Sequence, residues 1–275
     1  MVRSRGKSVA LHATLIAACL ISVFPLVWLV LTSIKPRGAW TSTEIELFHD
    51  PTLSNYTELL GSTPFLTWAW NSVLVAVLTM VIGVILAASA GYAASRFRFP
   101  GLRPFLWMLL VTQMFPVAIL IVPLYNLLAG LGLINQFAGL TVCYLTVAVP
   151  FCAWMMKGYF DTVPFEIDQA GMVDGLTPFG AFRRLILPLS RPGLAVTAFY
   201  SFITAWGEVA YATAFMTGDE RYTLAVGLQT FVAQFKTEWG LMTAASVLIA
   251  IPAAAVFLLV QRHLVTGLTA GSTRG

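Results

Sequence analysis

Long apolar runs separated by short polar segments dominate the chain. Six runs reach roughly 20–25 residues, the length with which an α-helix crosses the hydrocarbon core of a bilayer. Because no water is available at that depth, backbone polar groups must be satisfied within the segment, which favours helices. The runs cover residues 10–32, 70–94, 105–128, 137–156, 189–215 and 241–261. The pattern therefore predicts an all-α, polytopic membrane protein with six transmembrane helices.

The composition agrees with this pattern. Of the 275 residues, 58% are hydrophobic and only 10% are charged, whereas soluble domains carry about 25% charged residues. The remaining sequence is short, with outer loops at about 33–69 and 216–240, so we expect a single transmembrane domain over residues 1–275. The first run is longer than the apolar core of a signal peptide and continues into Pro25 and Trp28 without a small-residue cleavage site. We expect it to remain as a membrane anchor.

The basic residues are distributed unevenly between the two sides of the predicted bundle. If the N-terminus is cytoplasmic, twelve of the 16 Lys and Arg residues fall in cytoplasmic segments and four fall outside. Since Lys and Arg are enriched in cytoplasmic loops, both termini are predicted to lie in the cytoplasm. The net charge of +4 is then a consequence of topology, and nucleic acid is not expected as a partner.

Residues that could carry catalysis are scarce. The three histidines are far apart, and none has a Cys, Asp or Glu at metal-ligand spacing. The three cysteines, Cys19, Cys143 and Cys152, fall in apolar runs without a CxxC pair, as expected of small packing residues. We therefore predict that this chain is not an enzyme and holds no metal or cofactor, and that any ATP hydrolysis linked to its work takes place on a separate chain.

The connection between the fourth and fifth runs, residues 157–188, is patterned as structure and not as a simple loop. Pro164 suits the first turn of a helix, where its missing N–H costs nothing, and Glu166 and Asp168 favour the positive end of that helix. Gly175 fits its C-terminal cap. A first short helix is thus predicted between Pro164 and Gly175.

A second short helix is predicted after this glycine. Thr177 fits its N-cap and Pro178 its first position. Both helices have an apolar side: Ile167, Ala170 and Val173 on the first, and Phe179, Phe182, Leu185 and Ile186 on the second. The pattern alone leaves two interpretations open. The pair either rests on lipid headgroups, with Arg183 and Arg184 toward phosphates, or fills a groove on a cytoplasmic partner.

The spacing within this segment resembles a known motif. Gln169-Ala170-Gly171 is followed after three residues by Gly175 and after nine more by Leu185-Ile186-Leu187-Pro188. This is similar to the EAA loop of ABC importer permeases, whose pattern is E-A-A, three residues, G, nine residues, I-x-L-P. Gln169, Gly171 and Leu185 replace the motif's glutamate, second alanine and isoleucine.

The resemblance implies that residues 164–188 form a coupling helix that docks onto an ATPase. The residues that it assigns to this contact are Gln169, Ala170, Gly171, Asp174, Gly175, Phe179, Leu187 and Pro188. Because glutamine replaces glutamate at the first position, we expect docking through shape and apolar contact and not through a salt bridge at Gln169.

The similarity extends over nearly the whole chain. Phe24-Pro25-Leu26, residues 93–101 and residues 267–271 resemble permeases of carbohydrate importers. Residues 113–116, 157–160 and 222–227 are similar to the shorter permease of maltose/maltodextrin importers. The family implies a type I ABC importer permease fold in a bacterial or archaeal cytoplasmic membrane, and transport of maltose or maltodextrin. A permease for another sugar or polyol such as trehalose is the alternative.

The resemblance also implies partners. These are a second, longer permease that completes the translocation path, two copies of a cytoplasmic ATPase that bind ATP and Mg²⁺, an extracytoplasmic sugar-binding protein, and membrane lipid. The C-terminal tail, with Gly271, Arg274 and Gly275, resembles one that inserts between the ATPase subunits. The outer residues Asp219, Glu220 and Arg221 resemble a contact for the binding protein, and a solvated turn explains them equally well.

Polar residues inside apolar runs are costly and mark candidate functional sites. Glu208 is the clear ionisable case; it either lines the path or braces a neighbouring helix, and the second role is favoured. Gln113 and Asn71 are expected to make interhelical hydrogen bonds. Pro116, Pro123 and Pro252 predict kinked spans. A stand-alone secondary transporter is the less favoured alternative, because such proteins show inverted repeats and several intramembrane charges.

Overall fold

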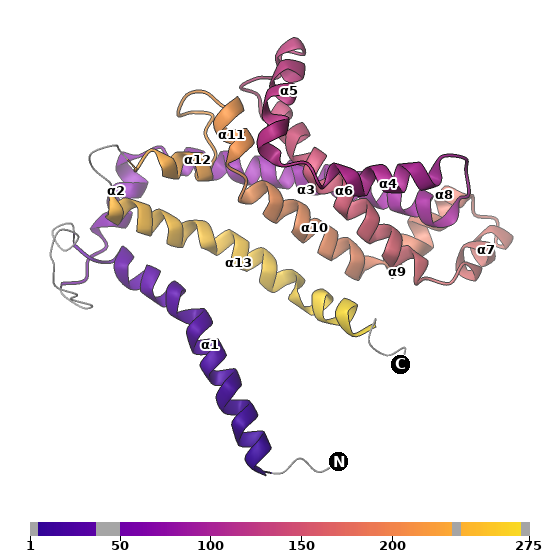
Figure 1. Ribbon diagram of the computed structural model, residues 1–275, viewed down its shortest axis with the longest axis horizontal. Coiled ribbons are helices and arrows are strands. Elements are labelled where there is room, and N and C mark those ends of the chain that lie inside the picture. The colour runs from indigo at the N-terminus through magenta and orange to yellow at the C-terminus, as the bar shows by residue number, and fades with distance from the viewer. Residues whose placement is uncertain (1–4, 37–49, 233–237, 271–275) are drawn as a thin grey trace. The chain divides into compact units, whose positions relative to one another are not determined.

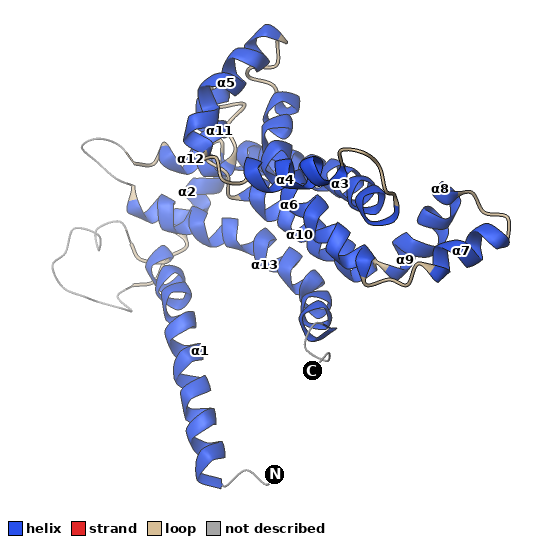
Figure 2. Cartoon of the chain, turned by 45° about the vertical axis from the view of Figure 1, so that its right-hand side comes forward, coloured by secondary structure: helices blue, strands red, loops and turns tan. Residues whose placement is uncertain are grey.

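The computed structural model describes residues 5–36, 50–232 and 238–270. Within these residues, the regular elements are helices (Figures 1 and 2). In chain order they are α1 (Arg5–Ser33), α2 (Ser54–Ser62), α3 (Phe65–Arg96), α4 (Leu102–Thr112), α5 (Val117–Gly130), α6 (Phe137–Asp161), α7 (Glu166–Val173), α8 (Pro178–Ala181), the π-helix η2 (Phe182–Ile186), α9 (Leu187–Leu189), α10 (Arg191–Trp206), α11 (Ala210–Phe215), α12 (Leu224–Gln229) and α13 (Trp239–Ala270). The all-α prediction is confirmed.

Among the described residues, four helices are individually long and apolar enough to cross a membrane, and up to six spans result if each of two bent helix pairs counts as one. The single spans are α1, α3, α6 and α13. The third span is bent where Pro116 predicted a kink, because α4 and α5 meet at 108°. Pro116 is the N-cap of α5 and has no N–H to continue a helix, and residues before a proline avoid the α region. By contrast, Pro123 and Pro252 lie inside α5 and α13.

The fifth predicted span, 189–215, is also interrupted. Its main helix α10 ends at Trp206, and α11 begins at Ala210. Glu208 lies in the break, where its carboxylate accepts backbone N–H groups of Tyr211 (3.0 and 3.1 Å) and Ala212 (3.2 Å). A carboxylate in this place caps the positive end of a helix. The helix that Glu208 braces is therefore the short one that follows it in sequence.

The chain divides into two compact units. The first comprises residues 1–66 and 228–251, and the second comprises residues 67–227 and 252–275. In the first unit, Asn55 on α2 donates its side-chain amide to the carbonyls of Ser33 and Lys35, both at 2.9 Å. The Ser33 hydroxyl also lies 2.6 Å from the Tyr56 hydroxyl. These bonds attach α2 to the C-terminal end of α1.

The core of the second unit is built from α3, α4, α6 and the end of η2. Small side chains on α3 and α6 allow these helices to approach closely, as is common in membrane bundles. The buried cluster contains Ala87, Ala88, Tyr92, Leu109, Cys152, Ala153, Met156, Phe160, Phe182 and Ile186. Cys143 and Cys152 are buried as predicted, whereas Cys19 is exposed.

Candidate functional site

The predicted connecting segment begins later than expected, because α6 continues to Asp161. Residues 157–161 are therefore helical, and the segment that remains is 162–190, here called the α7–α9 segment. Figures 1 and 2 show α7 and α8 beyond the ends of α6 and α10, at the end of the second unit. This placement leaves one side of the segment exposed.

Local backbone signals determine how α7 begins and ends. The helix starts at Glu166 with Phe165 as N-cap, so Pro164 precedes the helix and does not occupy its first turn. At the other end, the Leu176 N–H donates to the carbonyl of Gly171 (2.9 Å) and the Gly175 N–H to that of Met172 (3.1 Å). This is a Schellman motif, and it requires a left-handed residue after the cap. Gly175 has φ +87° and meets that requirement, as predicted.

The second helix starts as its sequence predicts. Thr177 is the N-cap of α8, its hydroxyl accepts the Gly180 N–H at 3.1 Å, and Pro178 occupies the first turn. The backbone then widens into η2, where the Leu187 N–H donates to the carbonyl of Phe182. Pro188 follows and has no N–H for the carbonyl four residues earlier, so a wider turn is favoured here. The sequence analysis did not predict this π-helical turn.

The two departures from the EAA pattern at Gly171 and Leu185 face each other. Gly171 is buried, and a Cβ added to it would lie 2.6 Å from Cδ1 of Leu185. The leucine methyl thus uses the space that an alanine Cβ would take. The motif's alanine and isoleucine are replaced together, as a complementary pair.

This complementarity gives a stability prediction. Alanine normally stabilises a helix interior by about 0.5–1 kcal/mol over glycine, but in Gly171→Ala the displacement of Leu185 from its rotamer costs about 0.5–1.5 kcal/mol and should cancel that gain. Adding Leu185→Ile should restore the gain and raise the melting temperature above that of Gly171→Ala, since a β-branched side chain is held in one helical rotamer and extends less far. Thermal unfolding of the original protein and the two variants measures both effects. A double variant that melts no higher than Gly171→Ala would contradict the pairing.

A buried polar cluster fastens α7 to α3. The Tyr92 hydroxyl donates to Oδ1 of Asp168 at 2.6 Å, and Nε of Arg96 donates to Oδ2 at 2.9 Å. The Arg96 and Asp168 side chains are only 7% and 4% exposed. Arg96 also donates to the carbonyl of Val163 at 2.9 Å, and its guanidinium lies 5.8 Å from the Phe165 ring centre. Asp168 was expected only as an acidic residue near a helix N-terminus, so its main contact was missed.

An aromatic cluster lies beside these polar contacts. The Tyr92 ring lies 4.4 Å from that of Phe182 and 5.8 Å from that of Phe160, the second pair meeting edge to face. Ile167 packs against the same buried core. The predicted apolar edge of α7 is therefore divided, with Ile167 inward and Ala170 and Val173 exposed.

The outward side of the α7–α9 segment is unusually apolar. Val173 is 87% exposed and Phe179 70% exposed, and Phe165 and Met172 are also exposed. Of the other residues that the resemblance assigns to docking, Gln169, Ala170, Asp174 and Gly175 lie on the exposed surface near them. Leu187 is partly buried and Pro188 is exposed, and both lie in α9. We call Val173 and Phe179 the apolar tip. Apolar side chains exposed beside polar ones are typical of interaction surfaces.

The other end of α3 holds a second loop by its backbone. The Trp68 indole donates to the carbonyl of Asp219 at 2.8 Å, and the Asn71 amide donates to the carbonyls of Glu220 and Tyr222, both at 2.9 Å. The Ser72 hydroxyl accepts the Leu224 N–H at 2.7 Å. Asn71 was predicted to bond another helix, and the structure shows it bonding a loop.

The side chains of that loop remain available. Asp219 and Glu220 are exposed, in a turn where Gly218 has φ +84°. The Arg221 guanidinium lies 5.1 Å from the ring centre of Phe137, within the range of a cation–π contact. The three residues predicted to contact a binding protein are thus neighbours on one fixed turn.

The remaining candidate residues are dispersed. The Gln113 amide donates to the carbonyl of Val147 at 3.2 Å, which joins the end of α4 to α6 as predicted. Gly271, Arg274 and Gly275 lie outside the described residues. Within the described part of the chain, no three His, Cys, Asp or Glu side chains come together as a candidate metal site.

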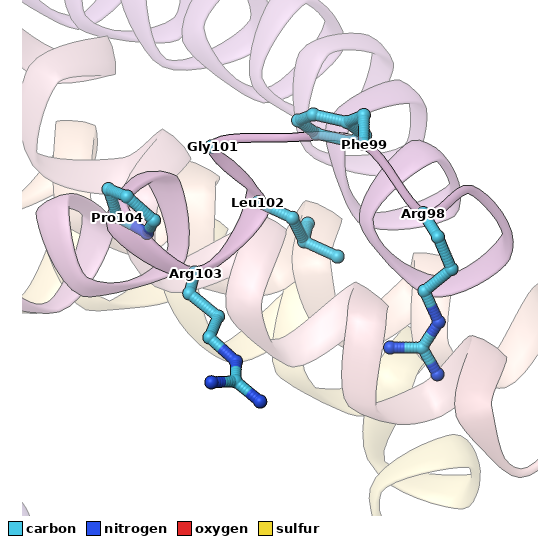
Figure 3. A pocket seen from close by; sticks show the side chains of 6 residues that line it. All are labelled: Arg98, Phe99, Gly101, Leu102, Arg103 and Pro104. Atoms are coloured by element: carbon cyan, nitrogen blue, oxygen red, sulfur yellow. The ribbon is translucent and has the colours of Figure 1, made fainter.

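A shallow hollow lies between α3 and α4. It is lined by Arg98, Phe99, Gly101, Leu102, Arg103 and Pro104, and Figure 3 shows both guanidinium groups on the same side of the ribbon. Both arginines are exposed. They follow the end of α3 that carries Arg96, so basic side chains gather at the end of α3 that contacts α7.

Comparisons with known proteins agree with this geometry. The family model described as "Binding-protein-dependent transport system inner membrane component" matches residues 5–269. The maltose/maltodextrin transport system permease protein MalG of Vibrio vulnificus (strain YJ016) is 38% identical, with all of both chains covered. The diacetylchitobiose uptake system permease protein DasC of Streptomyces coelicolor is 35% identical, covering 92% of each chain.

A solved structure shows the same fold. A chain from the crystal structure of a bacterial ABC transporter involved in the import of the acidic polysaccharide alginate superimposes with a TM-score of 0.82 at 22% identity, covering 95% of this chain and 99% of that one. The chain therefore belongs to the family of binding-protein-dependent transport system inner membrane components, the integral membrane permeases of ABC transporters.

Proposed function

We propose that this permease imports maltose or maltodextrins and couples to a separate ATPase through the α7–α9 segment. The observation that carries the coupling role is the apolar tip, two exposed apolar side chains on a helix pair whose bend and caps are fixed by Gly175 and Thr177. A preformed apolar protrusion of this kind suits a groove on a partner protein. The identity to MalG over the full chain supports the sugar.

The same proposal assigns the two ends of α3 to opposite sides of the membrane. Basic residues gather at the end that contacts α7, which favours the cytoplasm for that side and for both termini. The turn with Asp219, Glu220 and Arg221 would then face the extracytoplasmic sugar-binding protein. The fixed backbone and exposed acidic side chains of this turn support that contact.

The remaining partners follow from the same reasoning. A second, longer permease would complete the translocation path, and two copies of the ATPase would bind ATP and Mg²⁺, with no cofactor on this chain. All of residues 1–275 would then act as one membrane domain surrounded by lipid. The tail residues Gly271, Arg274 and Gly275 would reach the ATPase. Transport would alternate the spans between inward-open and outward-open states by rigid-body movement.

Uptake in a strain that lacks this chain tests the sugar. Uptake of labelled maltotriose should fall to background and should return when the chain is supplied from a plasmid. Uptake of trehalose and diacetylchitobiose is the control, the second because of the likeness to DasC. Loss of either control sugar with unchanged maltotriose uptake would replace the maltodextrin assignment with the other sugar and leave the family unaffected.

A further inference from the structure

The helix α3 carries the contacts at both of the surfaces just assigned. Near its start, Trp68, Asn71 and Ser72 bond the backbone of residues 219–224. Near its end, Tyr92 and Arg96 bond Asp168 on α7. All of these residues belong to the same compact unit. Arg96 lies 25 positions after Asn71 on this helix, a separation of about 37 Å at 1.5 Å per residue.

The part of α3 between these two contacts has features that resist bending. α3 runs from Phe65 to Arg96 as one element of 32 residues without proline, whereas α1, α5, α6 and α13 each contain one. Sharp kinks in helices arise mainly at proline or where the hydrogen-bond ladder is interrupted. Small residues of α3, including Ala87 and Ala88, are buried in the core of the unit. α3 continues as one helix through Gly83 and Gly91 as well, which favours the transmission of a displacement from one end to the other.

The contact with α7 fixes an orientation as well as a position. A buried ion pair adds little net stability compared with apolar residues of the same volume, because both charges lose their hydration. Its bonds are directional, however. The two oxygens of Asp168 accept from two different side chains of α3, and Arg96 also reaches the carbonyl of Val163 before α7. These three directional hydrogen bonds from α3 fix the orientation of α7. Apolar packing alone would constrain that orientation less strictly.

The contact at the other end depends on the backbone. The indole and amide of α3 donate to carbonyl oxygens of residues 219, 220 and 222, so the position of the turn is fixed whichever side chains it presents. Gly227 lies so close to the Trp68 ring that a Cβ there would overlap it. The exposed side chains of Asp219 and Glu220 remain free to meet a partner.

We propose that α3 acts as a rigid rod that links the turn 219–224 to α7, with Tyr92, Arg96 and Asp168 as positioning residues for the coupling helix. The inference rests on the proposed function, because it takes the turn as the surface for the binding protein and α7 as the surface for the ATPase. Docking of the sugar-loaded binding protein on the turn then changes the orientation of α7 through α3. Because α3 moves as one body, a partner bound at either end shifts the same equilibrium between its positions.

The test uses the complete importer in lipid vesicles, with its second permease and ATPase. ATP hydrolysis is measured with and without the sugar-loaded binding protein, and sugar uptake is measured per ATP. Asp168→Asn removes the charge that Arg96 faces, and Asn71→Ala removes two of the four hydrogen bonds that hold the turn. Ser89→Ala is the matched control, because Ser89 lies on the same helix and its exposed hydroxyl donates to the Ile85 carbonyl within α3. Tyr92→Phe removes a single hydroxyl and keeps the ring, as a milder variant.

Asp168→Asn and Asn71→Ala should each lower the stimulation by the binding protein on the order of tenfold, and Ser89→Ala should not. The double variant decides between a rod and two local supports. Sites this far apart normally combine independently, so two local supports would multiply to roughly a hundredfold loss. If α3 is a rod, disconnecting one end already interrupts the coupling, and disconnecting the second end removes little more stimulation. The loss of stimulation in the double variant should then stay near tenfold.

Four other outcomes have distinct meanings. A hundredfold loss in the double variant, or normal stimulation in Asp168→Asn, would overturn the rod. If Asp168→Asn does not assemble with the ATPase, Tyr92→Phe takes its place, with a smaller loss expected and the same comparison with Asn71→Ala. Absence of any stimulation in the unaltered importer would instead refute the proposed function.

Discussion

The double variant Val173→Asp/Phe179→Asp is expected to lose its ATPase. Val173 and Phe179 form the apolar tip, 87% and 70% exposed, and docking would bury both. Full burial of side chains of this kind contributes about 1.5–3 kcal/mol each, and each 1.4 kcal/mol corresponds to a factor of about ten in affinity. Removing both contacts and placing carboxylates in an apolar groove should weaken binding by a factor of about 100 or more.

Copurification of the ATPase with the tagged permease measures this effect. Thr162→Asp is the control, because it adds a carboxylate at an exposed position of the same segment, before α7 begins. The control should retain its ATPase and its uptake of sugar. If the double variant also retains its ATPase, the apolar tip is not the docking surface. The alternative of a segment that rests on lipid headgroups would then be preferred.

Gly175→Val should strongly lower uptake while the ATPase remains bound. Gly175 has φ +87° and closes the Schellman motif of α7. A left-handed conformation costs an L-residue about 1–2 kcal/mol, and a β-branched residue tolerates it least. The valine variant should therefore open the bend between α7 and α8 and misdirect α7. We expect uptake to fall about tenfold or more, with hydrolysis of ATP continuing uncoupled.

Gly175→Asn is the matched control for the backbone argument. Asparagine enters the left-handed region more readily than other residues with a side chain, and it can replace glycine at this cap. Because nothing lies within 4 Å of a Cβ added at residue 175, steric overlap does not distinguish the two variants. Uptake by the asparagine variant should stay close to that of the original protein. Equal loss in both variants would show that the side chain, and not the bend, is responsible.

Features of the fold that depend on only a few neighbouring residues could be predicted from the sequence. Thr177 and Pro178 specify the start of α8, and Gly175 specifies the end of α7, because caps depend on the local backbone alone. The long apolar runs gave the number of candidate spans for a similar reason. Hydropathy responds to composition, so it passes over interruptions such as the one at Pro116, where the residues on both sides remain apolar.

Contacts between distant segments could not be predicted in the same way. Asp168 lies 76 residues from Tyr92 and 72 from Arg96, and its acidic side chain has an adequate local explanation at a helix N-terminus. Arg96 likewise had an adequate explanation without a distant contact, because basic residues are expected in cytoplasmic loops. The paired replacement at Gly171 and Leu185 was visible as two departures from a motif, but only the fold shows that they compensate each other.

The π-helical turn at Phe182–Ile186 determines how the direction of α8 can change. A π-turn holds one residue more than an α-turn. If it tightened to α geometry, the helix before it would rotate by about 100° and shift by about 1.5 Å relative to α9. The backbone could make that change by exchanging one hydrogen-bond partner for the next, without exposing a break to solvent or lipid. Phe179 would then point in a new direction while Pro188 stayed in place.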